Sequence, residues 1–271
     1  AGVEVIVGSA GDDSVTVSTN DIQAISGGEG FDDVTLTDAS GNTVDLAGVE
    51  VTTGSAGDDT LTVTDDTSVT LDGGGGADTL TGNAGDDILI GGLGSDTVIG
   101  GGGADFVDGG QDDDLLELDG SAGVTAEGGD GTDTVVLVGE TNEASLSGVE
   151  VVVGSAGDDS VTVSTNDIEA ISGGEGFDDV TLTDASGNTV DLAGVEVITG
   201  SDGSDILTVT DDTSVMVDGG DGADTLIGNV GDDTLLGGLG SDTLIGGGGA
   251  DFVDGGQDDD LLELDGSAAG V

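Results

Sequence analysis

The residues of this sequence that could do chemistry are its acids. The chain of 271 residues contains 59 Asp and Glu residues and no Lys, Arg or His, which gives a formal net charge of −59. Because no protein cation can balance this charge, self-repulsion opposes a compact state unless ions from solution neutralise it. Carboxylates are hard oxygen ligands, so the composition indicates binding of multivalent metal cations.

The residue types that are missing exclude several classes of protein. Without His, Cys or Lys the chain lacks the usual nucleophile–base pairs, Schiff-base lysines and zinc ligands, so we expect no enzyme and no catalytic residues. A hydrolase with paired carboxylates is the remaining enzymatic alternative, but four Phe and no Trp or Tyr offer little for a substrate cleft. The acidity disfavours nucleic acid as a partner, and no apolar run is long enough for a membrane span.

Many of the aspartates occupy the sixth position of a nine-residue, glycine-rich motif. From residue 73 the segments GGGGADTLT, GNAGDDILI, GGLGSDTVI, GGGGADFVD and GGQDDDLLE follow one another without a gap. They fit the pattern G-G-x-G-x-D-x-U-x, where U is aliphatic, except that Asn83 and Asp112 each replace a glycine. Four separate segments carry a serine at the second position, which is Ser9, Ser55, Ser155 or Ser201. These departures leave the local turn geometry open.

The motif predicts a turn followed by a short strand. Glycine accepts the positive-φ conformations of a sharp turn, so the first six positions can point carbonyl oxygens and the Asp carboxylate toward one centre. Positions seven to nine alternate as a strand does, and the eighth is expected to point inward. In the first copy these inward residues are Val15, Val34, Leu61, Leu80, Leu89, Val98, Val107, Leu116 and Val135.

A longer repeat contains the shorter one. Residues 18–51 return at 164–197 with one substitution, at an offset of 146 residues. We therefore expect a first repeat unit at 1–153 and an incomplete second unit at 154–271. One period contains 16 segments of nine or ten residues, an even number, so two segments can form each coil in the same register in both copies. The prediction is an all-β protein, a β-solenoid of about fifteen coils.

The nonapeptides resemble the calcium-binding repeats of the RTX (repeats-in-toxin) family. The resemblance implies a parallel β-roll in which Ca²⁺ ions lie between the Gly/Asp turns of successive coils. A hard set of carbonyl and carboxylate oxygens suits Ca²⁺ better than Mg²⁺, which demands a strict octahedron.

Threading the segments alternately onto the two sides of such a roll predicts which turns stack. The expected ligands on one side are Asp59, Asp78, Asp96, Asp114 and Asp133, and in the second copy Asp205, Asp224, Asp242 and Asp260. On the other side they are the pairs Asp13 and Asp32, Asp87 and Asp105, Asp159 and Asp178, and Asp233 and Asp251. One ion between each two adjacent motifs gives about eleven calcium sites.

These features predict a protein that folds on binding calcium. Because the turns cannot close until their charge is neutralised, the free energy of metal binding is largely the free energy of folding. Cytosolic calcium is low, whereas extracellular modules bind it at about 10⁻⁴ to 10⁻³ M. We therefore expect an extracellular, secreted or cell-surface location.

The leading functional hypothesis is a structural segment of a fibre, surface layer or long adhesin, in which nearly identical units add length. The alternative is a calcium-triggered folding and secretion module of a secreted toxin, protease or lipase whose catalytic domain lies outside this chain. An open solenoid exposes unpaired strand edges, so besides calcium the expected partner is a second copy, joined end to end or laterally.

Overall fold

The computed structural model describes residues 4–264, which form an all-β parallel solenoid, as predicted, with about 14 turns where about fifteen were expected. The chain divides into two compact units, residues 1–138 and 139–271. The boundary that we expect between the sequence repeats, at 153/154, lies further along the chain. It marks where the sequence starts to repeat and not where contacts are fewest, so it stays a prediction. The one helical element among the described residues is a 3₁₀ turn, η1 (Gly120–Ala122), and no helix in 4–264 is long and apolar enough to cross a membrane.

The first unit consists of two parallel sheets, and consecutive strands alternate between them. One sheet contains, in order, β1 (Glu4–Val7), β3 (Ile22–Ser26), β5 (Thr43–Ala47), β7 (Thr60–Val63), β9 (Thr79–Asn83), β11 (Thr97–Gly101), β13 (Leu115–Leu118) and β15 (Thr134–Leu137). The other contains β2 (Ser14–Val17), β4 (Asp33–Leu36), β6 (Val51–Thr53), β8 (Thr70–Gly75), β10 (Ile88–Leu93), β12 (Phe106–Gln111) and β14 (Val124–Asp130).

The second unit repeats this arrangement. One sheet contains β17 (Val151–Val153), β19 (Ala170–Ser172), β21 (Thr189–Ala193), β23 (Ile206–Val209), β25 (Thr225–Ile227), β27 (Thr243–Ile245) and β29 (Leu261–Glu263). The other contains β16 (Asn142–Ser147), β18 (Asp159–Val163), β20 (Asp179–Leu182), β22 (Val197–Thr199), β24 (Met216–Asp218), β26 (Thr234–Leu239) and β28 (Phe252–Gln257).

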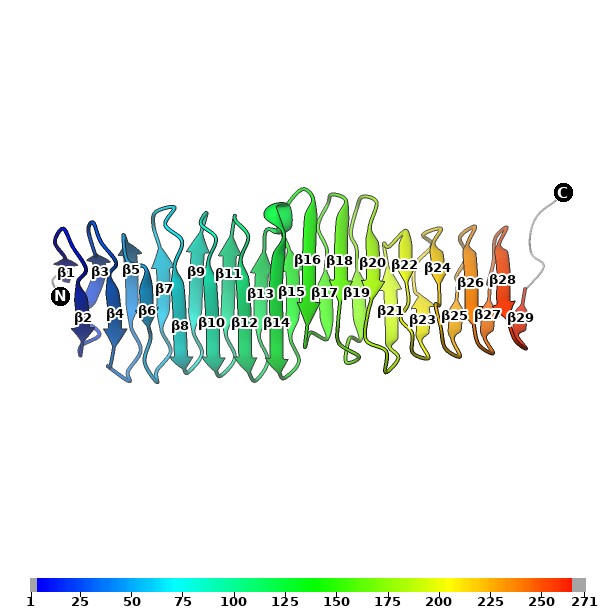
Figure 1. Cartoon of the computed structure of the whole chain (residues 1–271), viewed down its shortest axis with the longest axis horizontal. Helices are drawn as coiled ribbons and strands as arrows, with labels where there is room; N and C mark the ends of the chain where they lie inside the picture. The colour runs from blue at the N-terminus through cyan, green and yellow to red at the C-terminus, as the bar shows by residue number, and fades with distance from the viewer. Residues whose placement is uncertain (1–3, 265–271) are drawn as a thin grey trace. The chain divides into compact units, whose positions relative to one another are not determined.

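Two nonapeptides form one coil. Leu80 of β9 pairs with Val98 of β11, which in turn pairs with Leu116 of β13, so identical motif positions lie side by side. Figure 1 shows the strands between them, β10 and β12, running in the opposite direction. The turns of every second motif therefore stack on the same side of the unit, which is the arrangement that brings the sixth-position aspartates together.

The core is a single layer of aliphatic side chains between the two sheets. Eight of the nine predicted inward residues are at most 1% exposed, namely Val34, Leu61, Leu80, Leu89, Val98, Val107, Leu116 and Val135. Burying each side chain of this size stabilises the fold by about 1.5–3 kcal/mol. Val15 is the exception and is only half-buried, because its strand β2 lies at the edge of the sheet and has a neighbour on one side.

Candidate metal centre

The turns before the strands take the sharp conformation that the glycines predict. In the motif that begins at residue 91, the second and fourth glycines, Gly92 and Gly94, have φ angles of 114° and 104°. Asn83 and Asp112, which replace glycines at these two positions, keep φ at 96° and 73°. Asn and Asp tolerate this region better than other side chains do, so both substitutions preserve the turn.

The sixth-position aspartates of stacked turns are joined by hydrogen bonds. The backbone N–H of Asp78 donates to Oδ1 of Asp96 at 2.7 Å, and the N–H of Asp96 donates to Oδ1 of Asp114 at 2.8 Å. The same bond recurs along the side, in the order Asn42, Asp59, Asp78, Asp96, Asp114, Asp133, and in the second unit Asn188, Asp205, Asp224, Asp242, Asp260. This confirms the predicted stacking of the turns on this side.

The opposite side carries shorter runs of the same bond. The predicted neighbours are joined in each case, with N···Oδ1 distances of 2.8 to 3.1 Å, in the pairs Asp13 and Asp32, Asp87 and Asp105, Asp159 and Asp178, and Asp233 and Asp251. These turns lead into even-numbered strands, for example β10 after Asp87 and β12 after Asp105. The register of both sides is therefore as predicted, whereas the metal-binding role of these aspartates stays a prediction.

Most of these carboxylates are buried with one oxygen unsatisfied. The side chains of Asp78, Asp96 and Asp224 are at most 2% exposed. Within residues 4–264, buried Oδ2 atoms without a hydrogen-bond partner belong to Asp32, Asp78, Asp87, Asp96, Asp105, Asp114, Asp178, Asp224 and Asp242. A buried carboxylate oxygen without a donor is costly, so each of these atoms needs a proton or a cation.

Three other groups of aspartates complete the predicted set. Asp13, Asp251 and Asp260, in outer coils, are half-buried. In Asp59, Asp159 and Asp205, both carboxylate oxygens accept hydrogen bonds. Asp133 and Asp233 are buried, and the Oδ2 of Asp233 accepts the N–H of Asn229 at 3.1 Å. The predicted ligands therefore share a position in the turn but differ in how their charge is satisfied.

The pKa values report the same unmet charge. Burial raises the pKa of Asp78 and of Asp114 from 3.8 to about 7, and the neighbouring Asp carboxylates add to this effect. Burial also raises the pKa of Asp96 to about 6, against the lowering effect of the N–H of Asp78. Since the negative form is disfavoured in a turn with no cation, a bound divalent ion would restore it.

In these turns, except that of Asp105, a backbone carbonyl of the next coil lies beside the unsatisfied carboxylate. A Cβ atom placed on Gly73 would clash with Oδ2 of Asp78 and would lie 2.7 Å from the carbonyl oxygen of Gly91 in the next coil. The first glycine thus leaves room between two oxygens of adjacent coils. No three acidic side chains of the described chain converge where they could hold a metal, so an ion here would take backbone carbonyls as its remaining ligands. This oxygen-only environment fits a calcium ion.

The sequence motif missed several acids that have the same structural roles. Oε2 of Glu50 accepts the N–H of Asp32 at 2.7 Å, and Oε2 of Glu196 accepts the N–H of Asp178 at 2.8 Å. Their position directly before strands β6 and β22 was the available signal.

The sixth-position hydrogen bonds form a ladder between coils, and fifth-position aspartates make a second set of such bonds. In each, Oδ1 accepts a backbone N–H of the following coil. These aspartates are Asp12, Asp58, Asp86, Asp113, Asp158 and Asp232.

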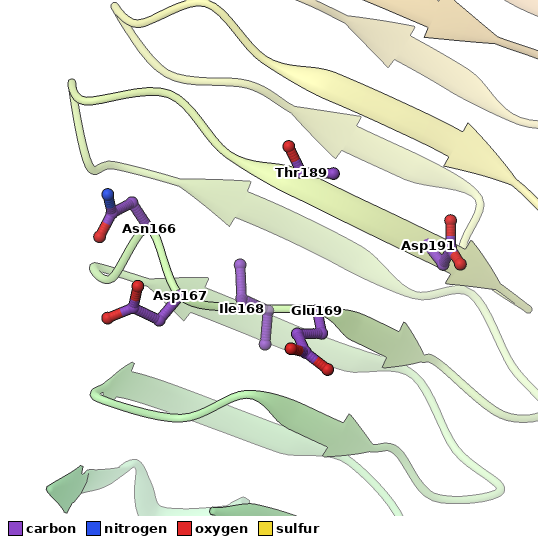
Figure 2. A pocket seen from close by; sticks show the side chains of 6 residues that line it. All are labelled: Asn166, Asp167, Ile168, Glu169, Thr189 and Asp191. Carbon is purple, nitrogen blue, oxygen red and sulfur yellow. The ribbon is translucent and has the colours of Figure 1, made fainter. Parts of the chain in front are cut away.

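A surface hollow of the second unit offers no comparable site. It has a volume of about 420 Å³ and is lined by Asn166, Asp167, Ile168, Glu169, Thr189 and Asp191. Figure 2 shows Asp167 and Asp191 at opposite ends of the hollow, with Glu169 between them. Its acids do not converge, and none of the sixth-position aspartates lines it.

Comparison with known proteins identifies the motif. The family model described as the RTX calcium-binding nonapeptide repeat matches residues 1–18, 70–98, 81–116, 90–124, 216–244 and 227–262. A search of curated proteins gives no match. The matches include the uninterrupted motifs from residue 73, whose turns carry the buried, unsatisfied carboxylates. RTX repeats bind calcium, and several copies of the RTX calcium-binding nonapeptide repeat lie along this chain.

Proposed function

We propose that this chain is an extracellular structural protein, a calcium-stabilised segment of a fibre, surface layer or long adhesin that folds when it meets calcium outside the cell. One observation carries the proposal, the series of buried Asp Oδ2 atoms that lack a partner in stacked turns. A fold that buries this charge, in a chain with no Lys, Arg or His, requires cations to be stable unless the carboxylates are protonated. About eleven ions would follow from the stacked motifs.

The repeated architecture supports a structural role. The second unit uses the same turns and strands as the first, and a strut made of equal parts gains length without needing a unique site. RTX solenoids are typically non-catalytic. Exposed aromatic rings favour self-association as part of this role, since Phe31, Phe177 and Phe252 are 57%, 55% and 59% exposed.

Far-ultraviolet circular dichroism of the full chain during a calcium titration tests the proposal. In excess EDTA at neutral pH we expect a disordered chain, because the aspartate turns cannot close, and in millimolar calcium we expect the strand signal. Magnesium is the matched control and is expected to be much less effective at equal concentration, since it keeps its waters and demands octahedral geometry. A strand signal that EDTA leaves unchanged would contradict the proposal.

A further inference from the structure

Three turns differ from the others because a neutral amide lies against the aspartate. We call them the amide-closed turns, and each consists of an Asn, a Ser and an Asp. They are Asn42, Ser55 and Asp59 in the first unit, and Asn142, Ser155 and Asp159 together with Asn188, Ser201 and Asp205 in the second. The Asn occupies the place that an Asp holds in the other stacked turns.

The carboxylate of Asp59 is fully hydrogen-bonded. Its Oδ1 accepts both the backbone N–H and the side-chain Nδ2 of Asn42, each at 2.6 Å, and its Oδ2 accepts the N–H of Ser55 at 2.6 Å. Asp59 is 1% exposed, as deeply buried as Asp78 at 2%, whose Oδ2 has no partner. The difference between the two carboxylates is therefore in their donors and not in their burial.

The serine changes the path of the turn. At the second motif position, Gly74 has a φ of 100°, but Ser55 lies outside the positive-φ region and turns its N–H toward Oδ2 of its own aspartate. Oγ of Ser55 in addition accepts the N–H of Gly57 at 3.3 Å. Gly57 is also outside the positive-φ region, whereas Gly76 at the equivalent position has a φ of 111°. The interior of this turn presents N–H donors near the carboxylate.

The other two amide-closed turns repeat these contacts. Nδ2 of Asn188 lies 2.8 Å from Oδ1 of Asp205, and the N–H of Ser201 donates to Oδ2 of Asp205 at 2.8 Å. Asp159 receives the equivalent bonds at 2.6 Å and 2.7 Å. N–H groups stabilise the negative carboxylate as a cation would. The partial positive charges on their hydrogens also oppose the approach of a calcium ion.

We infer that the three amide-closed turns are completed by hydrogen bonds in place of calcium, so Asp59, Asp159 and Asp205 bind no ion. Calcium is then confined to the other turns, in which an Oδ2 atom is left without a donor. The inference rests on the proposed calcium-dependent fold and refines it by dividing the sixth-position aspartates into ligands and non-ligands. Asn42, Asn142 and Asn188 determine this division.

Counting bound calcium on the full chain tests the inference. Equilibrium dialysis in saturating calcium, with circular dichroism to verify the fold, compares the wild type with Asp59→Asn and Asp78→Asn. We expect Asp59→Asn to keep the wild-type number of ions and Asp78→Asn to lose at least one. Equal losses in the two variants, with both folded, would overturn the inference.

The converse substitutions test it by gain of binding and cover the case in which Asp59→Asn fails to fold. The double variant Asn42→Asp/Ser55→Gly recreates the glycine-rich turn and its Asp neighbour, so we expect one additional ion. Asn166→Asp, which adds the same charge at an exposed position, is the control and is expected to add none. An unchanged ion count in the double variant overturns the inference, whereas a wild-type chain that binds no calcium overturns the proposed function instead.

Discussion

The first glycine of the motif gives a direct test of the role of the carboxylate beside it. Gly100 and Gly102 lie two residues apart in one motif, and both are outside the positive-φ region, so alanine imposes no backbone strain at either. A Cβ on Gly100 would lie 2.7 Å from Oδ2 of Asp105, whereas a Cβ on Gly102 would meet nothing within 4 Å. Gly100→Ala therefore displaces the carboxylate that we assign to calcium, and Gly102→Ala is its matched control.

The magnitude follows from this geometry. Carbon and oxygen do not approach within 3.0 Å, so the Asp105 carboxylate must move by a few tenths of an ångström, at an overpacking cost of about 1–3 kcal/mol. A site that calcium saturates at about 100 times its Kd also contributes about 2.7 kcal/mol, part of which is lost. Oδ1 of Asp105 is fixed by the N–H of Asp87 at 3.0 Å, which limits how far the carboxylate can adjust.

Calcium titration and thermal unfolding in saturating calcium, both followed by circular dichroism, measure the effect. We expect Gly100→Ala to raise the calcium midpoint and to lower Tm by several degrees, at about 2–4 °C per kcal/mol for a unit of this size, while Gly102→Ala stays close to the wild type. Identical midpoints for the two variants would refute the assignment of Asp105 to a metal-binding turn.

Two further predictions concern charge and packing. Because burial raises the pKa of Asp78 and Asp114 to about 7 from 3.8, the folded chain binds protons more tightly than the unfolded chain; this stabilisation is complete below pH 3.8 and is lost as pH rises through about 7. In EDTA the strand signal is therefore expected to increase from pH 8 to pH 5, and a decrease over this range contradicts the pKa direction. Leu89→Ala, at a fully buried position, is expected to cost about 2–5 kcal/mol. Ile88→Ala, on the same strand but 44% exposed, is its control, and equal Tm losses in calcium would contradict the inward assignment of the eighth position.

The pairing of turns could be predicted from the sequence because it depends only on counting. Two segments of nine or ten residues form one coil, so Asp78, Asp96 and Asp114 must lie on the same side once the strands are parallel. The inward position followed from alternation along each strand. The exposure of Val15 did not follow, since it depends on whether a strand has a neighbour on both sides.

The residues that the motif missed occupy segments that have lost their glycines. Asn42 and Glu50 take the sixth position there. The N–H of Asn42 donates to Asp59, and the carboxylate of Glu50 accepts the N–H of Asp32, so both make the bond that an Asp makes elsewhere. A pattern defined by glycines does not detect them, because the ladder requires only an oxygen or amide of suitable reach. Whether a carboxylate is left for a metal or satisfied by an amide depends on the neighbouring coil, about 17–19 residues away.

The two carboxylate oxygens of a sixth-position aspartate have different roles, and this couples its own turn to the turn of the preceding coil. Oδ1 of Asp96 holds the backbone N–H of Asp78, while its Oδ2 is left without a donor. An ion at Oδ2 would fix the carboxylate, and the fixed carboxylate would order the preceding coil through Oδ1. We therefore expect binding at one turn to favour binding at the next, because a repeat is stabilised mainly by its neighbours. This coupling is expected to end at Asp59, where Asn42 and Ser55 already satisfy both oxygens, so an amide-closed turn marks one end of a cooperative run.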